Sequence, residues 1–264
     1  AALKAGFAMS ADYTYGKGDY TFAFTEAENT MNGSATVESG NFNVVMDKDK
    51  LGYGAGSKGA VVTVAGSQIP FPELKVSYAE SVFNFLMPVS KSDTPSDFAV
   101  VTKIIDLALP EEVWAMADPT AALPHDPLTV AIDTKGSAKL NIDMMDAAAM
   151  EAAGDAAPGE LHSLDLTELT VKAAGAEIVG SGALTFDNTD TTTFQGMPAP
   201  TGTVDFKVTG ANALMDKLAS MGLIPEDQLM GARMMLGMFA KMVEGQTDTM
   251  TSTVEFKDKG LFVN

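Results

Sequence analysis

Few side chains in this sequence are of types that commonly catalyse reactions. The chain has two histidines, His125 and His162, and no cysteine. A Ser–His–acid triad needs its nucleophile within hydrogen-bond reach of the histidine, but Ser163 directly follows His162, and neighbouring strand residues point to opposite faces. The Gly-x-Ser-x-Gly elbow of many hydrolases does not occur. The sequence therefore predicts a protein that is not an enzyme and needs no cofactor.

Oxygen ligands gather in the short segment DNTD at residues 187–190. Carboxylate and amide oxygens suit calcium, although the spacing is not that of an EF-hand loop. Asp and Asn are also favoured in turns, where their side chains accept hydrogen bonds from the nearby backbone. Asp187 and Asp190 are thus either turn residues or ligands of a weak calcium site.

Methionine is frequent, with 17 residues in the chain. Four of them recur at intervals of four, which places them on one face of a predicted helix: Met230, Met234, Met238 and Met242. This face, widened by Phe239, could pack against a sheet as core. It could instead be an adaptable surface for a lipid or a partner protein, or bind Cu(I) through thioethers, although no histidine accompanies the cluster.

The charge balance excludes several classes of partner. Lys and Arg number 17 against 35 Asp and Glu, a formal net charge of −18. Nucleic-acid binding and polybasic attachment to membranes both need clustered cations, so neither is expected. The absence of cysteine, the acidity and the many small polar residues fit an exported bacterial protein, and we predict a periplasmic location.

The chain contains no run of about 20 apolar residues that could span a bilayer as a helix, and no signal peptide. Both ends interrupt patterns typical of strands. We therefore expect a longer natural chain, with any signal or anchor outside these residues, and at most peripheral contact with a membrane.

Apolar residues alternate with period two through the first ninety residues, which predicts antiparallel strands. Asn32-Gly33 between two such runs is typical of a hairpin turn. The spacing then changes, and Val100, Val101, Ile104 and Ile105 predict a helix over about 98–109. A second short helix begins near Pro110, which gives a helical hairpin over about 98–117.

The same order returns in the second half of the chain. Strands are predicted around 164–171, 184–186 and 204–208, followed by helices over about 211–221 and 226–243 and by closing strands around 254–263. Pro110-Glu111-Glu112 and Pro225-Glu226-Asp227 match at an offset of 115 residues. This match predicts a degenerate internal repeat.

The fold class expected from these elements is α+β. We predict an extended, twisted antiparallel β-sheet in two related halves, each with a helical hairpin packed on one face. The N-terminal half is 1–145, a flexible insertion rich in Ala, Gly and acidic residues is 146–160, and the C-terminal half is 161–264 with its helical hairpin at about 211–243.

The last third of the chain resembles a family of uncharacterised exported proteins of Gram-negative bacteria, a domain of unknown function. The resemblance is best over residues 198–264, in the segments PAPTG at 198–202, VTGANALMD at 208–216, LASMGLIP at 218–225 and KGLFVN at 259–264. Such proteins are loosely similar to AsmA-like envelope proteins, whose long curved β-sheets handle lipids. The resemblance implies a fold and supplies no site residues.

Two functions are consistent with these observations. The first is a periplasmic or envelope binding or scaffold protein whose concave sheet and Met-rich helix receive an apolar ligand such as a lipid. The second is an accessory subunit of a larger membrane-associated complex, which contacts an envelope membrane protein. The predicted contact residues are Met230, Met234, Met238, Met242 and Phe239.

Overall fold

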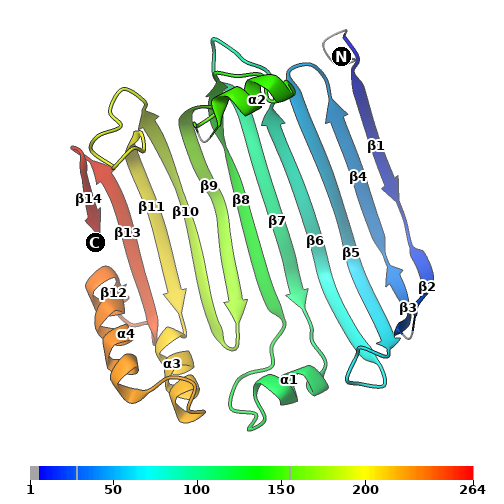
Figure 1. Cartoon of the computed structure of the whole chain (residues 1–264). Helices are drawn as coiled ribbons and strands as arrows, with labels where there is room; N and C mark the ends of the chain where they lie inside the picture. Colours follow the sequence, from blue (N-terminus) through cyan, green and yellow to red (C-terminus); the bar gives the residue numbers. More distant parts are fainter. Residues whose placement is uncertain (1–5, 28, 155, 264) are drawn as a thin grey trace.

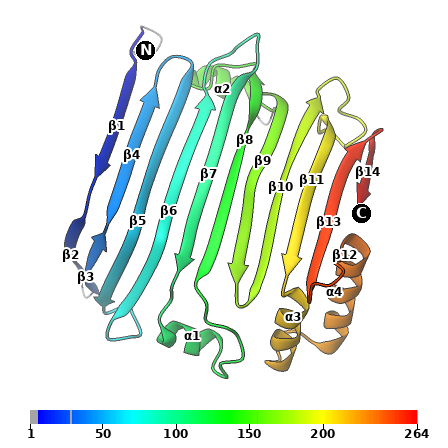
Figure 2. The same cartoon turned by 180° about the vertical axis from the view of Figure 1, so that it is seen from behind.

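The computed structural model describes residues 6–27, 29–154 and 156–263 as one open, antiparallel β-sheet of 14 strands (Figures 1 and 2). The strands are β1 (Met9–Tyr15), β2 (Gly18–Glu26), β3 (Asn29–Val37), β4 (Ser39–Met46), β5 (Lys50–Gly66), β6 (Leu74–Pro88), β7 (Ser96–Leu107), β8 (Leu128–Leu140), β9 (Gly159–Ala173), β10 (Ala176–Asp187), β11 (Ala199–Thr209), β12 (Lys241–Met242), β13 (Thr249–Lys257) and β14 (Gly260–Val263). The helices are α1 (Glu111–Ala117), α2 (Ala147–Ala153), α3 (Ala211–Ser220) and α4 (Glu226–Phe239). The α+β class and the antiparallel sheet are as the sequence predicts.

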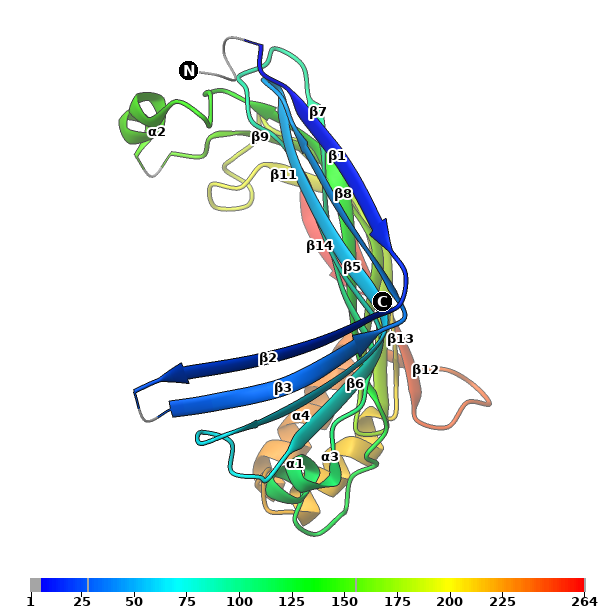
Figure 3. The same ribbon diagram turned by 90° about the vertical axis from the view of Figure 1, so that its right-hand side faces the viewer.

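The strand order follows the chain closely. From one edge to the other it is β1-β4-β5-β6-β7-β8-β9-β10-β11-β13-β12, with β14 also on β13 and the β2–β3 hairpin beside β5. Most neighbours are consecutive strands of the chain, so this is largely a meander. The helices lie at the two ends of the strands, α2 at one and α1, α3 and α4 at the other, and leave most of the sheet bare (Figures 1 and 3).

The sheet bends sharply near its N-terminal edge, where β2, β3 and the adjoining ends of β5 and β6 project as a wing (Figure 3). Gly59 lies at the bend with φ of +59°, a conformation that L-residues rarely adopt. A Cβ at this position would also lie 2.6 Å from Glu38 Cδ. Both observations require glycine at this point of β5.

The alternation of apolar residues along the strands shifts by one position at the bend. On β5 the inward side chains are Tyr53 and Ala55 above the bend and Val62 and Val64 below it. The two stretches face the same side, because the Tyr78 hydroxyl below the bend lies 3.0 Å from the Ser57 hydroxyl above it. Side chains converge in this way only inside a bend, so the apolar residues line its concave side.

We call this concave surface the inner face and the opposite one the outer face. Residues paired across an antiparallel ladder point to the same side, so the register assigns the faces strand by strand. The large apolar residues of the inner face on β6 to β11 include Phe83, Phe85, Phe98, Val100, Ile104, Val130, Ile132, Leu164, Leu166, Leu169, Val171, Ile178, Leu184, Val204, Phe206 and Val208.

Buried residues are few because no second layer covers the described sheet. The buried apolar side chains are Val37, Ala60, Val89, Trp114, Ala131, Leu140, Ala199 and Met250. Helix α3 covers a small part of the inner face, where Leu214, Val171, Ile178 and Val208 line a hollow of about 170 Å³. No helix of the described residues is long and apolar enough to cross a membrane.

The helix predicted over 98–109 is wrong: these residues form strand β7, which pairs with β6 and β8. The doublets Val100-Val101 and Ile104-Ile105 mimic a helical stripe because both faces of this strand carry apolar residues. Their β-branched side chains favour a strand. The first half therefore has the single helix α1 in this region in place of the predicted hairpin at 98–117.

The hairpin turn predicted at Asn32-Gly33 is also wrong, since both residues lie inside β3. Gly33 is needed there for another reason. A Cβ would lie 2.7 Å from the Phe22 ring on β2 and 2.3 Å from the Thr63 carbonyl on β5. The glycine lets an aromatic ring of the neighbouring strand cover the backbone.

The second helical hairpin is present as α3 and α4, but it ends earlier than predicted. Helix α4 stops at Phe239, and Met242 belongs to the two-residue strand β12. Helices α1 and α4 each begin directly after the proline of a matching motif, Pro110 and Pro225. Residues 146–160, expected to be a flexible insertion, contain the seven-residue helix α2.

Replacing Gly59 by Ala should destabilise the bend. We expect Gly59→Ala to lower the free energy of unfolding by at least ~1–2 kcal/mol, since an L-residue in this conformation is strained and Glu38 must move. The control is Gly16→Ala, which lies between β1 and β2, has no positive φ and has nothing within 4 Å of an added Cβ. Urea unfolding measures both. Equal stability of the two variants would contradict the role of Gly59.

Candidate functional site

The inner face presents an unusually large apolar surface to solvent. Near its centre Val100 is 42% exposed, Ile132 is 40% exposed and Val130 is 41% exposed. Monomeric proteins rarely expose contiguous apolar patches above roughly 300–600 Å², and larger ones mark binding surfaces. Because this surface continues from β4 to β13, and among the described residues only α3 covers a small part of it, it is the candidate site of the molecule.

An aromatic cluster forms the N-terminal part of the inner face. The Tyr53 ring lies 5.2 Å from Phe42, 6.3 Å from Phe83 and 6.2 Å from Phe85, measured between centroids. These four rings come from the three adjacent strands β4, β5 and β6. Such ring pairs stabilise the packing of the surface they form, so this region is a continuous aromatic platform.

Nearly all charged residues of the paired strands lie on the outer face. Among the described, paired strand positions, the register gives the inner face one charged residue, Glu26 at the tip of the wing. At the centre of the outer face, Lys103 Nζ lies 2.5 Å from Glu168 Oε2 and 3.9 Å from Asp133 Oδ2. The hydrogen bond to Glu168 raises the pKa of Lys103. One sheet therefore separates an ionic face from an apolar one.

The predicted contact residues of α4 are on the surface. Met230 is 75% exposed, Met234 65%, Met238 67% and Phe239 48%. Met242, on β12, is 60% exposed. The interpretation of this methionine face as core is wrong, because these side chains are exposed to solvent. Helix α4 is held mainly by α3. One link between them is the 2.5 Å contact of Arg233 Nη2 on α4 with Asp216 Oδ1 on α3.

His125 braces the loop that follows α1. Its ring stacks on Trp114 with centroids 4.6 Å apart and an interplanar angle of 5°. Its Nδ1 lies 2.9 Å from Glu111 Oε2, and its Nε2 lies 3.5 Å from Asp118 Oδ2. These contacts tie both ends of a seven-residue helix to its connector, which is a structural arrangement.

Asp118 is a buried carboxylate of the same brace. Burial raises its pKa, but hydrogen bonds from the Leu123 N–H and the Thr120 hydroxyl outweigh burial and hold the pKa below its usual range. The other histidine, His162 on β9, has its Nε2 3.6 Å from Glu160 Oε2. The two histidines belong to different parts of the fold and do not form one site.

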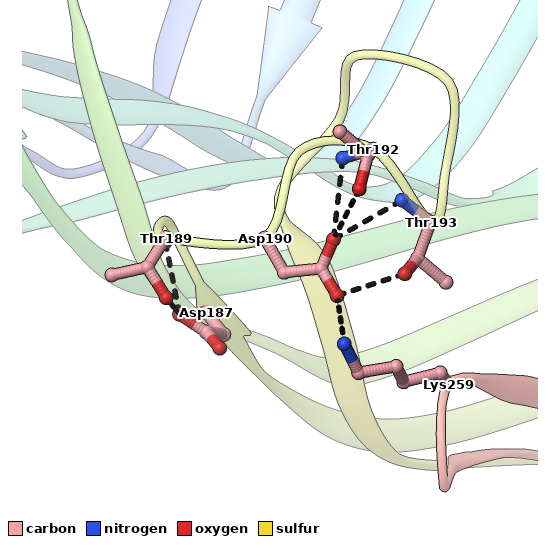
Figure 4. A network of polar contacts seen from close by, with 6 residues as sticks. All are labelled: Asp187, Thr189, Asp190, Thr192, Thr193 and Lys259. Atoms are coloured by element: carbon pink, nitrogen blue, oxygen red, sulfur yellow. Dashed lines mark hydrogen bonds and ion pairs between the residues drawn. The ribbon is translucent and has the colours of Figure 1, made fainter.

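Asp187 and Asp190 cap the turn that follows β10 (Figure 4). Asp187 Oδ1 accepts hydrogen bonds from the Thr189 N–H at 2.9 Å and the Thr189 hydroxyl at 2.6 Å. Asp190 accepts from both N–H groups of Thr192 and Thr193, and its Oδ2 lies 2.7 Å from Lys259 Nζ. The Lys259 ammonium, together with these threonines, holds the pKa of Asp190 far below its usual range.

This geometry favours the turn interpretation over the calcium site. A lysine occupies the position at Asp190 that a cation would need. Among the described residues, no group of three His, Asp or Glu side chains is placed to hold a metal ion. Asp190 instead fastens the β10–β11 connection to the turn between β13 and β14.

The sequence pattern does not predict the central residues of the inner face. Val100 and Ile104 were assigned to a helix stripe, although Phe98, Val100, Thr102 and Ile104 alternate with period two. That alternation, together with the β-branched composition, was the available signal. No local sequence pattern shows that the inner face is exposed. Exposure depends on whether another part of the fold covers the sheet, and strand periodicity is the same in both cases.

Neutralising Asp190 should weaken the fold in a pH-dependent way. We expect Asp190→Asn to be less stable than the wild type at pH 7. The difference should shrink as the pH falls below ~4, because a carboxylate with a depressed pKa stabilises the fold above its unfolded pKa of about 3.9 and loses this effect when protonated. Urea unfolding at several pH values tests this.

The control for Asp190→Asn is Asp258→Asn, which removes an exposed carboxylate from the neighbouring turn and should change stability little. The same measurement is repeated with calcium. A calcium-dependent rise in Tm that Asp190→Asn abolishes would contradict the turn interpretation and establish the metal site.

Comparison with known proteins places the chain in a bacterial family. No curated protein and no solved structure matches it. A family match extends over residues 13–264, so the likeness noted for residues 198–264 covers almost the whole chain, and the expectation of an uncharacterised bacterial family is confirmed. The chain belongs to the family described as "Uncharacterized protein conserved in bacteria (DUF2125)".

Proposed function

We propose that this protein is a non-catalytic lipid-binding protein of the bacterial periplasm or cell envelope, and that acyl chains bind on the inner face. The observation that carries the proposal is the broad apolar surface: among the described residues, only α3 covers a small part of it, and no charged side chain of the paired central strands lies on it. Burying one Val, Leu, Ile or Phe side chain contributes about 1.5–3 kcal/mol. An apolar ligand covering several of them would therefore be held firmly.

The dimensions of the sheet suit acyl chains. The longest strands of the meander have 15 to 17 residues, which corresponds to roughly 50 Å at ~3.3 Å per residue. An acyl chain spans one leaflet of a hydrocarbon core that is ~30 Å thick, so it is roughly 15 Å long. The inner face is long enough to hold a chain along the strands and wide enough for several side by side.

The same features support the proposed likeness to AsmA-like envelope proteins, since a long curved sheet with one apolar face is what the two would share. They also support a periplasmic location, where a carrier meets lipids without being embedded in a membrane. We propose peripheral contact at most, in keeping with the net charge of −18. We also propose that the two halves of the chain are related, because α1 and α4 each begin directly after the proline of a matching motif.

Exposure of the methionine face supports a second candidate function, that of an accessory subunit in a membrane-associated complex. Methionine side chains are unbranched and polarisable, which suits contact with an irregular apolar partner. We propose that Met230, Met234, Met238, Met242 and Phe239 contact an envelope membrane protein or its lipids. Native mass spectrometry after gentle extraction distinguishes the two functions: bound lipid favours the carrier, and stoichiometric subunits favour the accessory role.

A charge on the inner face should abolish lipid binding. We expect Ile132→Asp to weaken the affinity for a fluorescent phosphatidylcholine at least tenfold, because burying an unpaired carboxylate under acyl chains is costly. The control is Thr185→Asp, an exposed position on the outer face with the same charge change. Titration of the probe measures both affinities. Unchanged affinity in Ile132→Asp would contradict binding on the inner face.

Polar substitutions on α4 separate a contact role from a packing role. We expect the triple variant Met230→Ser, Met234→Ser, Met238→Ser to change the free energy of unfolding by little more than ~0.5 kcal/mol per site, as is usual for exposed positions. Its association with envelope membranes should fall, whereas the exposed control Gln228→Ser should leave it unchanged. A loss of ~2–5 kcal/mol per site would instead show that these methionines are packed.

A further inference from the structure

Hydroxyl groups are concentrated at one place on the inner face. The sequence has five tyrosines, and all of them lie on this face in the N-terminal strands. The register places Tyr13, Tyr15 and Tyr53 there, and the contacts across the bend, the Tyr78–Ser57 hydroxyl pair and the proximity of Tyr20 and Tyr78 to Tyr15, add Tyr20 and Tyr78. From β7 to β11 the face is formed mainly by Val, Leu, Ile and Phe. The inner face thus has a hydroxylated end and a hydrocarbon-like end.

Four of the tyrosines gather inside the bend. The Tyr13 and Tyr15 rings stack at 6.1 Å, and the Tyr78 hydroxyl lies 3.0 Å from the Ser57 hydroxyl. Burial raises the pKa of Tyr15, and the neighbouring phenols of Tyr20, Tyr78 and Tyr13 raise it further. We call Tyr13, Tyr15, Tyr20, Tyr78 and Ser57 the tyrosine cluster. Tyrosine suits positions that border apolar groups on one side and hydrogen-bonding groups on the other.

Cations are missing from this surface. No Lys or Arg among the described, paired strand positions shares the inner face, and those on the outer face include Lys58, Lys103 and Lys139, which contact Glu80, Glu168 and Glu160. The only arginine, Arg233, contacts Asp216. Phosphate groups in proteins are usually held by such cations, and the net charge of −18 repels an anion further.

We infer that the ligand is a lipid whose head group carries hydrogen-bonding oxygens but no net negative charge. This inference rests on the proposed function. The head group lies at the tyrosine cluster, where phenol and serine hydroxyls donate to and accept from uncharged polar groups. The acyl chains extend from there across β7 to β11. Anionic lipids are disfavoured because the described, paired strand positions of the inner face offer no Lys or Arg, and because the protein as a whole is acidic.

The test compares probes with the same acyl chains and different head groups on the full chain. Diacylglycerol and phosphatidylcholine should bind at least tenfold more tightly than phosphatidylglycerol, and the difference should narrow at high salt because screening weakens the repulsion. Equal or tighter binding of phosphatidylglycerol would overturn the inference and leave the proposed function intact. Failure of every probe to bind, for example because a second copy covers the inner face in a stable dimer, would overturn both.

A cation placed beside the cluster should reverse the selectivity. Ser81 pairs with Ser57 on the inner face, so we expect Ser81→Lys to raise the affinity for phosphatidylglycerol at least tenfold and to leave diacylglycerol binding within about threefold, because a local ammonium pairs with the phosphate. The matched control Thr185→Lys makes the same charge change on the outer face and should raise affinity far less. Equal effects of the two variants on phosphatidylglycerol affinity would show that the net charge of the protein alone sets the head-group selectivity, and would contradict a head group at the tyrosine cluster.

Removal of hydroxyls tests the position of the head group. We expect the double variant Tyr15→Phe, Tyr78→Phe to bind diacylglycerol several-fold more weakly while binding a pyrene hydrocarbon probe as the wild type does. The control Thr185→Val, which removes an exposed hydroxyl from the outer face, should bind both probes as the wild type does. A circular dichroism melt confirms that the variants fold. Unchanged diacylglycerol binding in the double variant would place the head group elsewhere and overturn the inference.

Discussion

The backbone hydrogen-bond ladder is the interaction on which the rest of this structure depends. Most domains bury one face of a sheet against a second layer, whereas here the described sheet has helices only at its ends (Figures 1 and 2). Antiparallel pairing between neighbours in the chain holds the strands together, and side chains on each face stabilise them pairwise. The hydrophobic surface that would otherwise form a core therefore remains available to other molecules.

The bend makes this surface concave, and few residues with an unusual backbone conformation are needed to form it. A single residue in a left-handed conformation, Gly59, coincides with a change in which strand positions point inward. The apolar lining continues through the bend because the sequence changes its alternation at the same place, from Tyr53 and Ala55 to Val62 and Val64. Local conformation and sequence pattern are thus matched, as expected for a chain that specifies one structure.

Much of the sheet could be predicted from the sequence, because period-two alternation is a local signal. This signal predicts the strands of the C-terminal half, whereas helical spacing predicts α3 and α4. β7 was missed since apolar doublets on both faces, Val100-Val101 and Ile104-Ile105, imitate helical spacing. Asn32-Gly33 imitates a hairpin turn, but its glycine is needed inside β3 because the Phe22 ring of the neighbouring strand lies over it. No local sequence pattern reveals such a contact. Burial of the methionines could not be decided, because amphipathic spacing is the same for a core helix and for a contact surface.

The exposure of the α4 methionines also has a redox consequence. Thioethers open to solvent are accessible to oxidants, and conversion to the sulfoxide turns a flexible apolar side chain into a polar one. Met230, at 75% exposed, and Met238, at 67%, would be among the first to react. Oxidative stress would then change the character of this helix surface while leaving the sheet intact, and a methionine sulfoxide reductase would restore it.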